Sequence, residues 1–219
     1  MEHEFNLMRP REATVYVARM RLREVTLSKL MDMEKEIEPA ALRLADAKVN
    51  IIGFGCTSGS LFRGLGHDQE IVTRIEKATN TPAVATAGAV VDAFKAIKLS
   101  KISVATPYTA EINSLEKRFL EENGVVIQKM KGLGIKDNQK IGEQSPQTLY
   151  KLVIEVDTAQ SDGVFVSCTN LRTIEVVGRL EKELKKPVVS SNIATLWAML
   201  RRAKYMKPIV GFGRVLTML

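Results

Sequence analysis

Short apolar runs rich in β-branched residues alternate with amphipathic segments along most of the chain. The runs have the length of buried strands, and the segments between them repeat apolar residues at helical spacing. This alternation is typical of an α/β protein in which helices cover a parallel sheet. The pattern predicts strands over residues 14–18, 49–54, 83–86, 102–105, 125–129, 163–167 and 187–190, with a short one over 209–211.

The predicted helices lie between these strands, and some have recognisable ends. Ser145 and Pro146 form a suitable N-cap and first-turn pair, and Asn123 followed by Gly124 is a typical helix stop. Pro39 predicts a kink or break within a helical segment over residues 26–47. Further helices are predicted over residues 68–79, 88–97, 109–123, 146–160, 171–185 and 193–203.

A weak internal repeat indicates how these elements are organised. VNIIGFGCTS is followed by Pro82, AVAT and a helical segment, and DGVFVSCTN is followed by Pro187, VVSS and another helical segment. Each copy is a buried strand, a Cys-Thr-polar turn, a helix, a proline, a short strand and a helix. This shared order predicts two pseudo-symmetric lobes. We expect one lobe over residues 1–106 and the other over 107–203, with 204–219 returning to the first lobe.

Composition narrows the class of protein. The 219 residues are 45% hydrophobic, which is enough for a substantial core, and they contain no apolar run of about 18 residues. The polar, charged start does not have the form of a secretory signal, so we expect a soluble cytoplasmic protein. The net charge of +7 comes from basic residues spread over the predicted helices. We therefore expect a solvated surface and neither a nucleic-acid nor a membrane partner.

The two cysteines, Cys56 and Cys168, each follow a predicted buried strand. They are too few and too far apart in sequence for a disulfide framework or a Cys-x-x-Cys motif, so we expect free thiols. Ligands bind beyond the carboxyl ends of parallel strands, where helix N-termini offer unpaired N–H groups. Hydroxyl and amide side chains follow both cysteines, which favours a site for a small carboxylate. A helix N-terminus would also lower the pKa of each thiol.

A cysteine at the end of a buried strand can also be inert packing. Repetition of the same polar turn favours a function instead. If the two lobes face each other, Cys56 and Cys168 lie on opposite sides of one cleft. One thiol could then supply a nucleophile or take a proton on one face of a substrate while the other acts on the opposite face.

The stretches GFGCTSGS, VSCTNLRT and ATPYTAEIN resemble the aspartate/glutamate racemase superfamily, specifically its branch of maleate cis-trans isomerases and arylmalonate decarboxylases. The resemblance implies two flavodoxin-like lobes, each a mainly parallel sheet flanked by helices, with the active site in the cleft between them. It implies that Cys56 and Cys168 are catalytic. It also implies a set of residues that bind the substrate carboxylate or the enediolate derived from it: Thr57, Ser58, Tyr108, Thr169 and Asn170.

The two cysteines separate the activities within this branch. The decarboxylases have glycine where this chain has Cys56, whereas the isomerases and racemases use a pair of cysteines. The second Cys-Thr-Asn turn favours conversion of maleate to fumarate, in which a thiolate adds, the central bond rotates and the thiolate leaves. The resemblance suggests Cys56 as the attacking thiolate and Cys168 as the proton donor. Arylmalonate decarboxylation, aspartate/glutamate racemisation and carboxylate binding without activity remain alternatives.

Several further expectations follow from the same residues. Neither isomerisation of maleate nor decarboxylation of an arylmalonate requires a cofactor in this branch. The sequence also has no Gly-x-Gly-x-x-Gly motif or phosphate loop, so we expect no cofactor. We expect no metal, because His3 and His67 have no partners at ligand spacing. The substrate is expected to be a small dicarboxylate. The resemblance also implies a homo-oligomer, a dimer or larger.

The start of the chain differs from that of the branch. Its members usually begin with an apolar strand and a loop carrying an asparagine to the substrate carboxylate, followed by something like Met-Glu-x-Glu-Phe. Here Met1-Glu2-His3-Glu4-Phe5 opens the sequence. We expect either that coding sequence lies upstream or that a central strand is lost, which would expose sheet edges.

Other polar features are interpreted as structural. We expect His67 to be a surface or capping residue, and Glu111 and Asn113 to be solvated. The glycine-containing stretch 132–138 favours a surface loop over a lid. Arg19 has two interpretations that the sequence does not separate: it pairs with a substrate carboxylate, or it forms a structural salt bridge.

Overall fold

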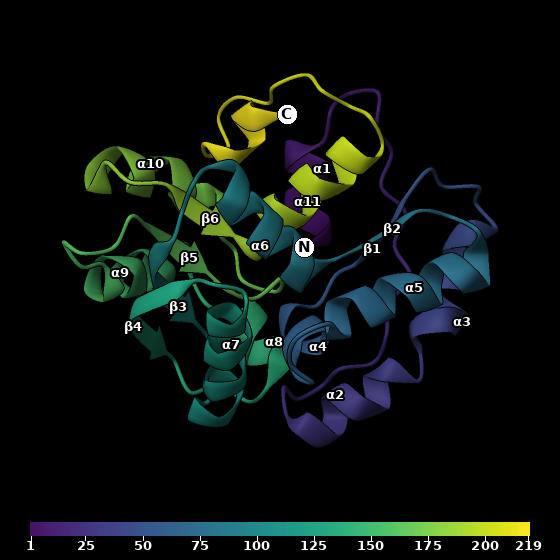
Figure 1. Cartoon of the computed structure of the whole chain (residues 1–219), viewed down its shortest axis with the longest axis horizontal. Coiled ribbons are helices and arrows are strands. Elements are labelled where there is room, and N and C mark those ends of the chain that lie inside the picture. Colours follow the sequence, from purple (N-terminus) through teal and green to yellow (C-terminus); the bar gives the residue numbers. More distant parts are fainter.

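Two parallel β-sheets with helices packed around them form the framework of the protein (Figure 1). The computed structural model describes all residues 1–219. The first sheet pairs β1 (Ile52–Phe54) with β2 (Ala83–Ala85). The second has the strand order β4-β3-β5-β6. Its strands are β3 (Lys101–Thr106), β4 (Val126–Gly132), β5 (Gly163–Val166) and β6 (Val188–Ser190).

The four-stranded sheet has the strand order of a flavodoxin-like doubly wound fold, in which the first strand lies between the second and the third. β5 and β6 are buried along their whole length, as expected for parallel strands covered on both faces. The division at residue 106 proposed from the sequence placed β3 in the first lobe. β3 instead pairs with β4 and β5, so the second sheet begins at Lys101. The sequence of one strand does not specify which edge it pairs with.

Most helices lie where their apolar spacing predicts them, and their bounds are α1 (Glu2–Met8), α2 (Leu27–Glu34), α3 (Ile37–Ala45), α4 (Thr57–Leu61), α5 (His67–Thr79), α6 (Thr86–Ala96), α7 (Ala110–Glu122), α8 (Asn138–Gly142), α9 (Pro146–Val156), α10 (Ile174–Leu184), α11 (Ser191–Arg202) and the 3₁₀ helix η1 (Val215–Met218). Ser145 Oγ accepts the N–H of Thr148 at 3.1 Å, which confirms the predicted cap of α9. The predicted break in the segment 26–47 is present between the end of α2 at Glu34 and the start of α3 at Ile37. Pro39 lies in the first turn of α3, a position that tolerates proline.

Two predicted strands are absent. Residues 14–18 pair with no strand, and Tyr16 and Val17 in this stretch are exposed. Residues 209–211 form no strand either, because the Ile209 N–H bonds to the carbonyl of Leu216 in the chain's last turn. Both stretches have a strand-like composition, but such residues form a strand only where a sheet edge is available for pairing.

The predicted repeat is visible in the way the two halves join. The helices that follow β2 and β6, α6 and α11, pack closely against each other, and Thr195 Oγ1 donates to Thr86 Oγ1 at 3.0 Å. The two helices lie side by side near the middle of the molecule (Figure 1). The apolar core is continuous across this junction, where Phe94 and Phe165 meet edge to face. The two halves are therefore packed as one body.

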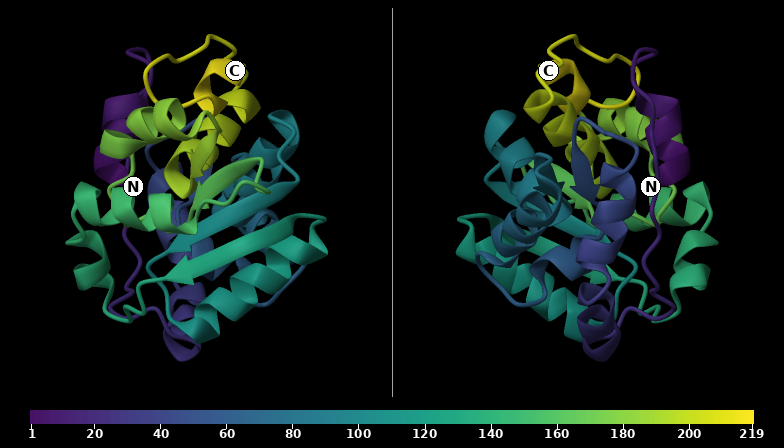
Figure 2. Two further views of the ribbon diagram at one scale, coloured as in Figure 1. Left: turned by 90° about the vertical axis from the view of Figure 1, so that its left-hand side faces the viewer. Right: turned by 90° about the vertical axis from the view of Figure 1, so that its right-hand side faces the viewer.

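The ends of the chain pack on the same side of the molecule (Figure 2). α1 contacts α11, and η1 packs on both α11 and α6. None of the helices combines the length and the apolarity needed to cross a membrane.

Candidate active site

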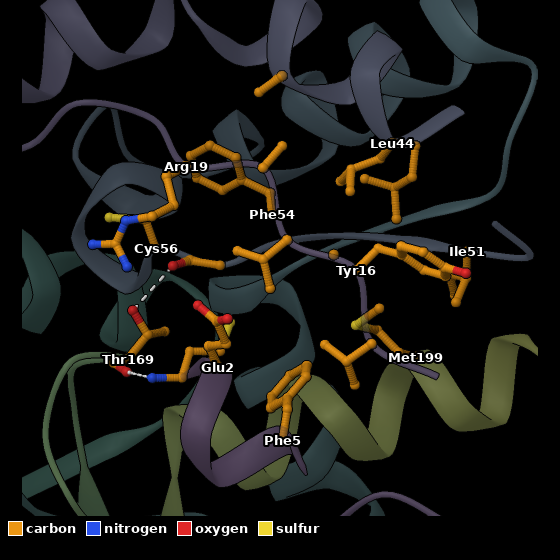
Figure 3. Close-up of a pocket in the computed structure, with 18 of the residues that line it drawn as sticks. Glu2, Phe5, Tyr16, Arg19, Leu44, Ile51, Phe54, Cys56, Thr169 and Met199 are labelled. Carbon is orange, nitrogen blue, oxygen red and sulfur yellow. Dashed lines mark hydrogen bonds between the residues drawn. The ribbon is translucent and has the colours of Figure 1, made fainter. Parts of the chain in front are cut away.

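A cavity of about 630 Å³ runs along the unpaired edge of β1 and reaches both cysteines. Figure 3 shows Cys56 and Thr169 toward one end of it, with Tyr16, Leu44 and Ile51 toward the other. Most of the lining is apolar. The cavity nevertheless brings together six of the seven site residues predicted from the sequence: Cys56, Ser58, Tyr108, Cys168, Thr169 and Asn170.

Cys56 is the N-cap of α4, and its sulfur accepts the N–H of Gly59 at 3.3 Å. Ser58 Oγ lies 3.7 Å from the same sulfur. Gly59 has a steric reason to be glycine, because an added Cβ would lie 2.5 Å from Met33 Cε and 3.0 Å from the Cys56 sulfur. Burial raises the pKa of the Cys56 thiol, against the smaller lowering by Gly59 and Ser58. The expected fall in this pKa is therefore wrong, because loss of solvation outweighs one short helix.

Cys168 lies in a strained turn and not at a helix N-terminus. Its φ is 105°, a conformation that side-chain-bearing residues rarely adopt, and α10 begins only at Ile174. The Asn170 N–H approaches its sulfur at 3.4 Å. Burial raises the pKa of the Cys168 thiol to about 11, while the Asn170 N–H and the Tyr108 hydroxyl lower it. The prediction of a low thiol pKa is therefore wrong for Cys168 as well.

The two cysteine turns are bound to each other by hydroxyl groups. Thr57 Oγ1 donates to Ser191 Oγ at 2.8 Å, and Ser191 Oγ also accepts the N–H of Cys168 at 3.1 Å. Thr169 Oγ1 donates to the carbonyl of Gly55 at 3.0 Å, a bond drawn in Figure 3. Thr57 does not line the cavity, and its hydroxyl reaches the second turn only through Ser191 at the start of α11. A negative charge on Cys56 would raise the pKa of Cys168, as expected for two thiols that line one cavity.

Tyr108 and Asn170 complete the polar end of the cavity. Tyr108 is buried beside the Cys168 sulfur, and burial raises the pKa of its hydroxyl well above 10, so the group is a neutral donor. Asn170 Nδ2 donates to the carbonyl of Asn138 at 2.7 Å. Asn138 also lines the cavity. The segment interpreted as a surface loop, residues 132–138, therefore reaches the site at its last residue.

Arg19 provides the cavity with an unpaired positive charge. It is exposed, lines the cavity and makes no ion pair or side-chain hydrogen bond. This distinguishes it from Arg9, another lining residue, whose guanidinium donates to the carbonyls of Pro10 and Ala13. Of the two interpretations left open from the sequence, the structure lacks the salt bridge. No group of three or more His, Cys, Asp or Glu side chains is placed to hold a metal ion.

Glu4 was not identified from the sequence, although it holds the second cysteine turn in place. It is buried, and its carboxylate accepts bonds from Thr173 Oγ1 at 2.9 Å, the Ile174 N–H at 2.8 Å and Asn192 Nδ2 at 2.7 Å. These donors lie at the start of α10 and α11. The only signal in the sequence is an acidic residue in a short amphipathic helix, which does not reveal partners about 170 residues away.

Two other polar residues differ from their interpretation. His67 is buried, with its ring against the edge of Phe62 at 5.0 Å, and is not a surface residue. Asn113 is half-buried and accepts the hydroxyl of Thr106 at 2.6 Å, so it is not simply solvated. Both lie on amphipathic helices, where a single polar residue facing inward breaks no visible pattern.

Comparison with known proteins shows the family. The profile described as arylmalonate decarboxylase matches residues 8–216. The maleate isomerase of Pseudomonas putida KT2440 is 32% identical over 217 residues, covering 96% of this chain and 86% of that protein. The arylmalonate decarboxylase of Bordetella bronchiseptica is 29% identical over 178 residues, covering 80% of this chain and 74% of that protein.

A solved structure is similar over nearly the whole chain. The crystal structure of a cysteine-to-alanine variant of the maleate isomerase Iso from Pseudomonas putida S16, with maleate, superposes with a TM-score of 0.93 at 26% identity. The match covers 99% of this chain and 89% of that one. The match confirms the α/β fold with parallel sheets flanked by helices that was predicted from the repeat. By sequence profile, relatives and fold together, this chain belongs to the arylmalonate decarboxylase family of enzymes.

Proposed function

We propose that the protein is a cofactor-independent isomerase that converts maleate to fumarate. The observation that carries this proposal is the meeting of Cys56 and Cys168 at one cavity, with hydroxyl and amide groups around them. A decarboxylation needs only one thiol to protonate an enediolate, whereas addition to a double bond and proton exchange together use two. Relatives that are maleate isomerases support the same choice.

The polar end of the cavity has groups suited to two carboxylates. Arg19 offers a positive charge, and guanidinium groups bind carboxylates with paired N–H donors. Ser58, Tyr108 and Asn170 offer neutral donors from the two lobes. We propose that these groups hold maleate with its double bond between the two sulfurs, and that Thr57 and Thr169 fix the relative position of the turns.

The reaction conserves atoms and electrons. Cys56 gives its proton to solvent water in the cavity, and its sulfur forms a bond to one alkene carbon while the π electrons move onto the other carbon and its carboxylate, giving an enediolate; the sulfur takes a proton back from solvent after it leaves. The former double bond is now single and rotates. Cys168 can give a proton to the enediolate carbon and take it back. When the electrons return, the C–S bond breaks, the trans double bond forms and fumarate leaves.

The experiment is an isomerisation assay by proton NMR, in which the alkene signals of maleate and fumarate are separate. We expect the unmodified protein to convert maleate without an added cofactor. Cys56→Ala and Cys168→Ala should each lose at least about 10²-fold in turnover, because each removes a reacting group. Ser114→Ala, an exposed serine on α7, is the control and should retain activity. Full turnover in both cysteine variants would exclude this mechanism.

Arylmalonate decarboxylation is the second candidate, and one observation favours it. The family profile, which is described as arylmalonate decarboxylase, matches residues 8–216. In that reaction Cys168 would protonate the enediolate left by loss of carbon dioxide, and Cys56 would not be needed. Release of carbon dioxide from phenylmalonate that survives Cys56→Ala but not Cys168→Ala would support this activity over isomerisation.

Two remaining alternatives have separate readouts. Solvent deuterium entering the α-carbon of aspartate or glutamate would indicate a racemase. Tight binding of a dicarboxylate without turnover of any of these compounds would indicate a binding protein.

A further inference from the structure

α7 carries a carboxyl group that the reaction above does not use. Glu116 is 0% exposed, and neither of its side-chain oxygens has a hydrogen-bond partner. It shares the buried face of the helix with Ile112 and Phe119. An isolated carboxylate without partners is costly to bury, so this environment favours the neutral, protonated acid. Such a group needs an explanation beyond packing.

The position of Glu116 connects it to the second cysteine turn. The Ser167 N–H bonds to the carbonyl of Ala105 at 2.9 Å, so Ser167 lies beside Thr106 at the ends of neighbouring strands. Asn113 on α7 binds the hydroxyl of Thr106. Glu116, almost one turn further along the same face, lies close enough to the hydroxyl of Ser167 for that hydroxyl to lower the Glu116 pKa, although the two groups do not meet hydrogen-bond geometry. That hydroxyl is also buried without a partner, and the next residue is Cys168.

α7 also contacts α4, the helix that begins after Cys56 (Figure 1). Glu116 therefore lies on a helix that contacts the element after Cys56, with its carboxyl group near the residue before Cys168. We propose that Glu116 is a positioning residue for Cys168: a neutral acid behind the thiol turn, whose ionisation would place a second negative charge beneath the site and oppose the formation of thiolate at Cys168. The proposal rests on the role given to Cys168 in the proposed function.

The electrostatics agree with this geometry. Burial raises the pKa of Glu116 from 4.5 to about 7, and Ser167 lowers it by less. A negative charge on Glu116 in turn raises the pKa of Tyr108, the hydroxyl that lies against the Cys168 sulfur. Proton loss from Glu116 at neutral pH would therefore raise the pKa of groups that contact the substrate in the proposed reaction.

Few other charged groups act on this cluster. The titratable groups that act on it are Tyr108, Cys168, Cys56 and the Met1 ammonium, whose positive charge lowers the pKa of Cys168, and α4 contributes none. On β4, Lys129 and Lys131 both bind Glu155. On α7, Lys117 and Arg118 pair with Glu121 and Glu122 on the exposed side of the helix. Lys101 of β3 is exposed at the opposite end of that strand.

The test measures the reactivity of Cys168 with iodoacetamide from pH 6 to 9 in Cys56→Ala protein, in which it is the only thiol. Two interacting groups titrate together, so the logarithm of the rate should rise with pH, flatten near pH 7 as Glu116 ionises, and then rise again. Glu116→Gln should remove this inflection and make Cys168 several-fold more reactive at pH 8.5. Glu111→Gln, an exposed site on the same helix, should match its Cys56→Ala parent.

A second variant shifts the inflection without touching the acid. Ser167 favours the charged form of Glu116, so Ser167→Ala should move the inflection to higher pH. This variant also tests the proposal should Glu116→Gln not fold. In protein with both cysteines, the same inflection is expected in turnover of maleate, and Glu116→Gln should remove it there.

Stability supplies a readout that needs neither reaction nor thiol. The folded protein holds the Glu116 proton up to about pH 7, whereas the unfolded chain releases it near pH 4.5. The stabilisation from that proton is complete below about pH 4.5 and is lost as pH rises to about 7. The urea midpoint of Glu116→Gln relative to the unmodified protein should therefore increase across this interval and stay constant above it.

The outcomes separate this proposal from the proposed function. Absence of maleate turnover with the inflection present would reject the isomerase and keep the coupling of Glu116 to Cys168. Alkylation profiles of Glu116→Gln and Ser167→Ala that both coincide with the parent profile would overturn the role of Glu116, whatever the substrate is.

Discussion

Tyr108 shows how burial determines the chemistry of a single side chain in this cavity. Its hydroxyl is kept from ionising by burial and by the nearby negative charges that the thiols and Glu116 can carry. It therefore stays a hydrogen-bond donor, and this donor lowers the pKa of Cys168. In the proposed reaction, this hydroxyl is the donor available to stabilise an enediolate oxygen.

We predict that Tyr108→Phe lowers the turnover of maleate by roughly 10²-fold, the typical cost of one donor that stabilises an oxyanion. It should also slow alkylation of Cys168 in Cys56→Ala protein, because the thiol pKa rises. The control is Tyr16→Phe, since Tyr16 lines the same cavity but is exposed and lies at its other end (Figure 3). Equal effects of the two substitutions would show that the hydroxyl of Tyr108 has no such role.

Individual site residues differ in how visible they are in the sequence. Cys56, Cys168 and Tyr108 stand next to strand ends in recognisable motifs, and the structure brings all three to one cavity. Glu4 and Ser191 could not be found in this way, because their roles depend on partners more than 20 residues away in the chain. The predicted lowering of the thiol pKa values was wrong for a related reason. A sequence shows that a helix follows a cysteine but not how deeply the thiol is buried, and burial raises both pKa values.

At the scale of elements, the first turns of α4 and α11 join the two halves. Ser191 begins α11 and receives hydrogen bonds from Thr57, which begins α4, and from the backbone of Cys168. Thr195, one turn further, bonds across to Thr86 at the start of α6. Hydroxyl side chains near helix starts thus connect the two halves. An apolar side chain in place of Ser191 would leave the buried N–H of Cys168 without an acceptor.

We predict that Ser191→Ala destabilises the protein by about 1–3 kcal/mol, since it leaves two buried donors without their acceptor. Urea unfolding checks this value. Turnover of maleate should fall as well, because the Cys168 turn loses one of its supports. The exposed variant Ser114→Ala is the control for loss of a hydroxyl and should change little. An unfolding midpoint for Ser191→Ala equal to that of Ser114→Ala would contradict the bridging role.

Element boundaries followed local sequence where local chemistry sets them. The Ser145 cap, the proline at the start of α9 and the stop at Gly124, whose φ is 83°, are all decided within a few residues. The short helix α1 was missed, and residues 14–18 were predicted as a strand. Apolar content alone does not show whether a segment will find a sheet edge.

At the scale of the whole molecule, the repeat predicted two parallel sheets with cysteines at the carboxyl ends of their strands, and this arrangement is present. The pairing of β3 was not predictable, because the choice between two sheets depends on contacts throughout the fold. Nor was the shape of the cavity, which extends from the sulfurs along the free edge of β1 between α3, α11 and residues 14–20.

We predict that the apolar region of this cavity binds a fluorescent naphthalene sulfonate dye in the folded protein, because apolar surface there is accessible without unfolding. Leu44→Lys places a charge in the wall and should weaken dye binding by about tenfold, or about 1.4 kcal/mol. Leu42→Lys, on the exposed face of the same helix α3, should bind dye as the unmodified protein does. The dye and maleate should compete only if the apolar region and the two thiols form one continuous site. Dye binding that is unchanged in Leu44→Lys would place the accessible apolar surface elsewhere on the molecule.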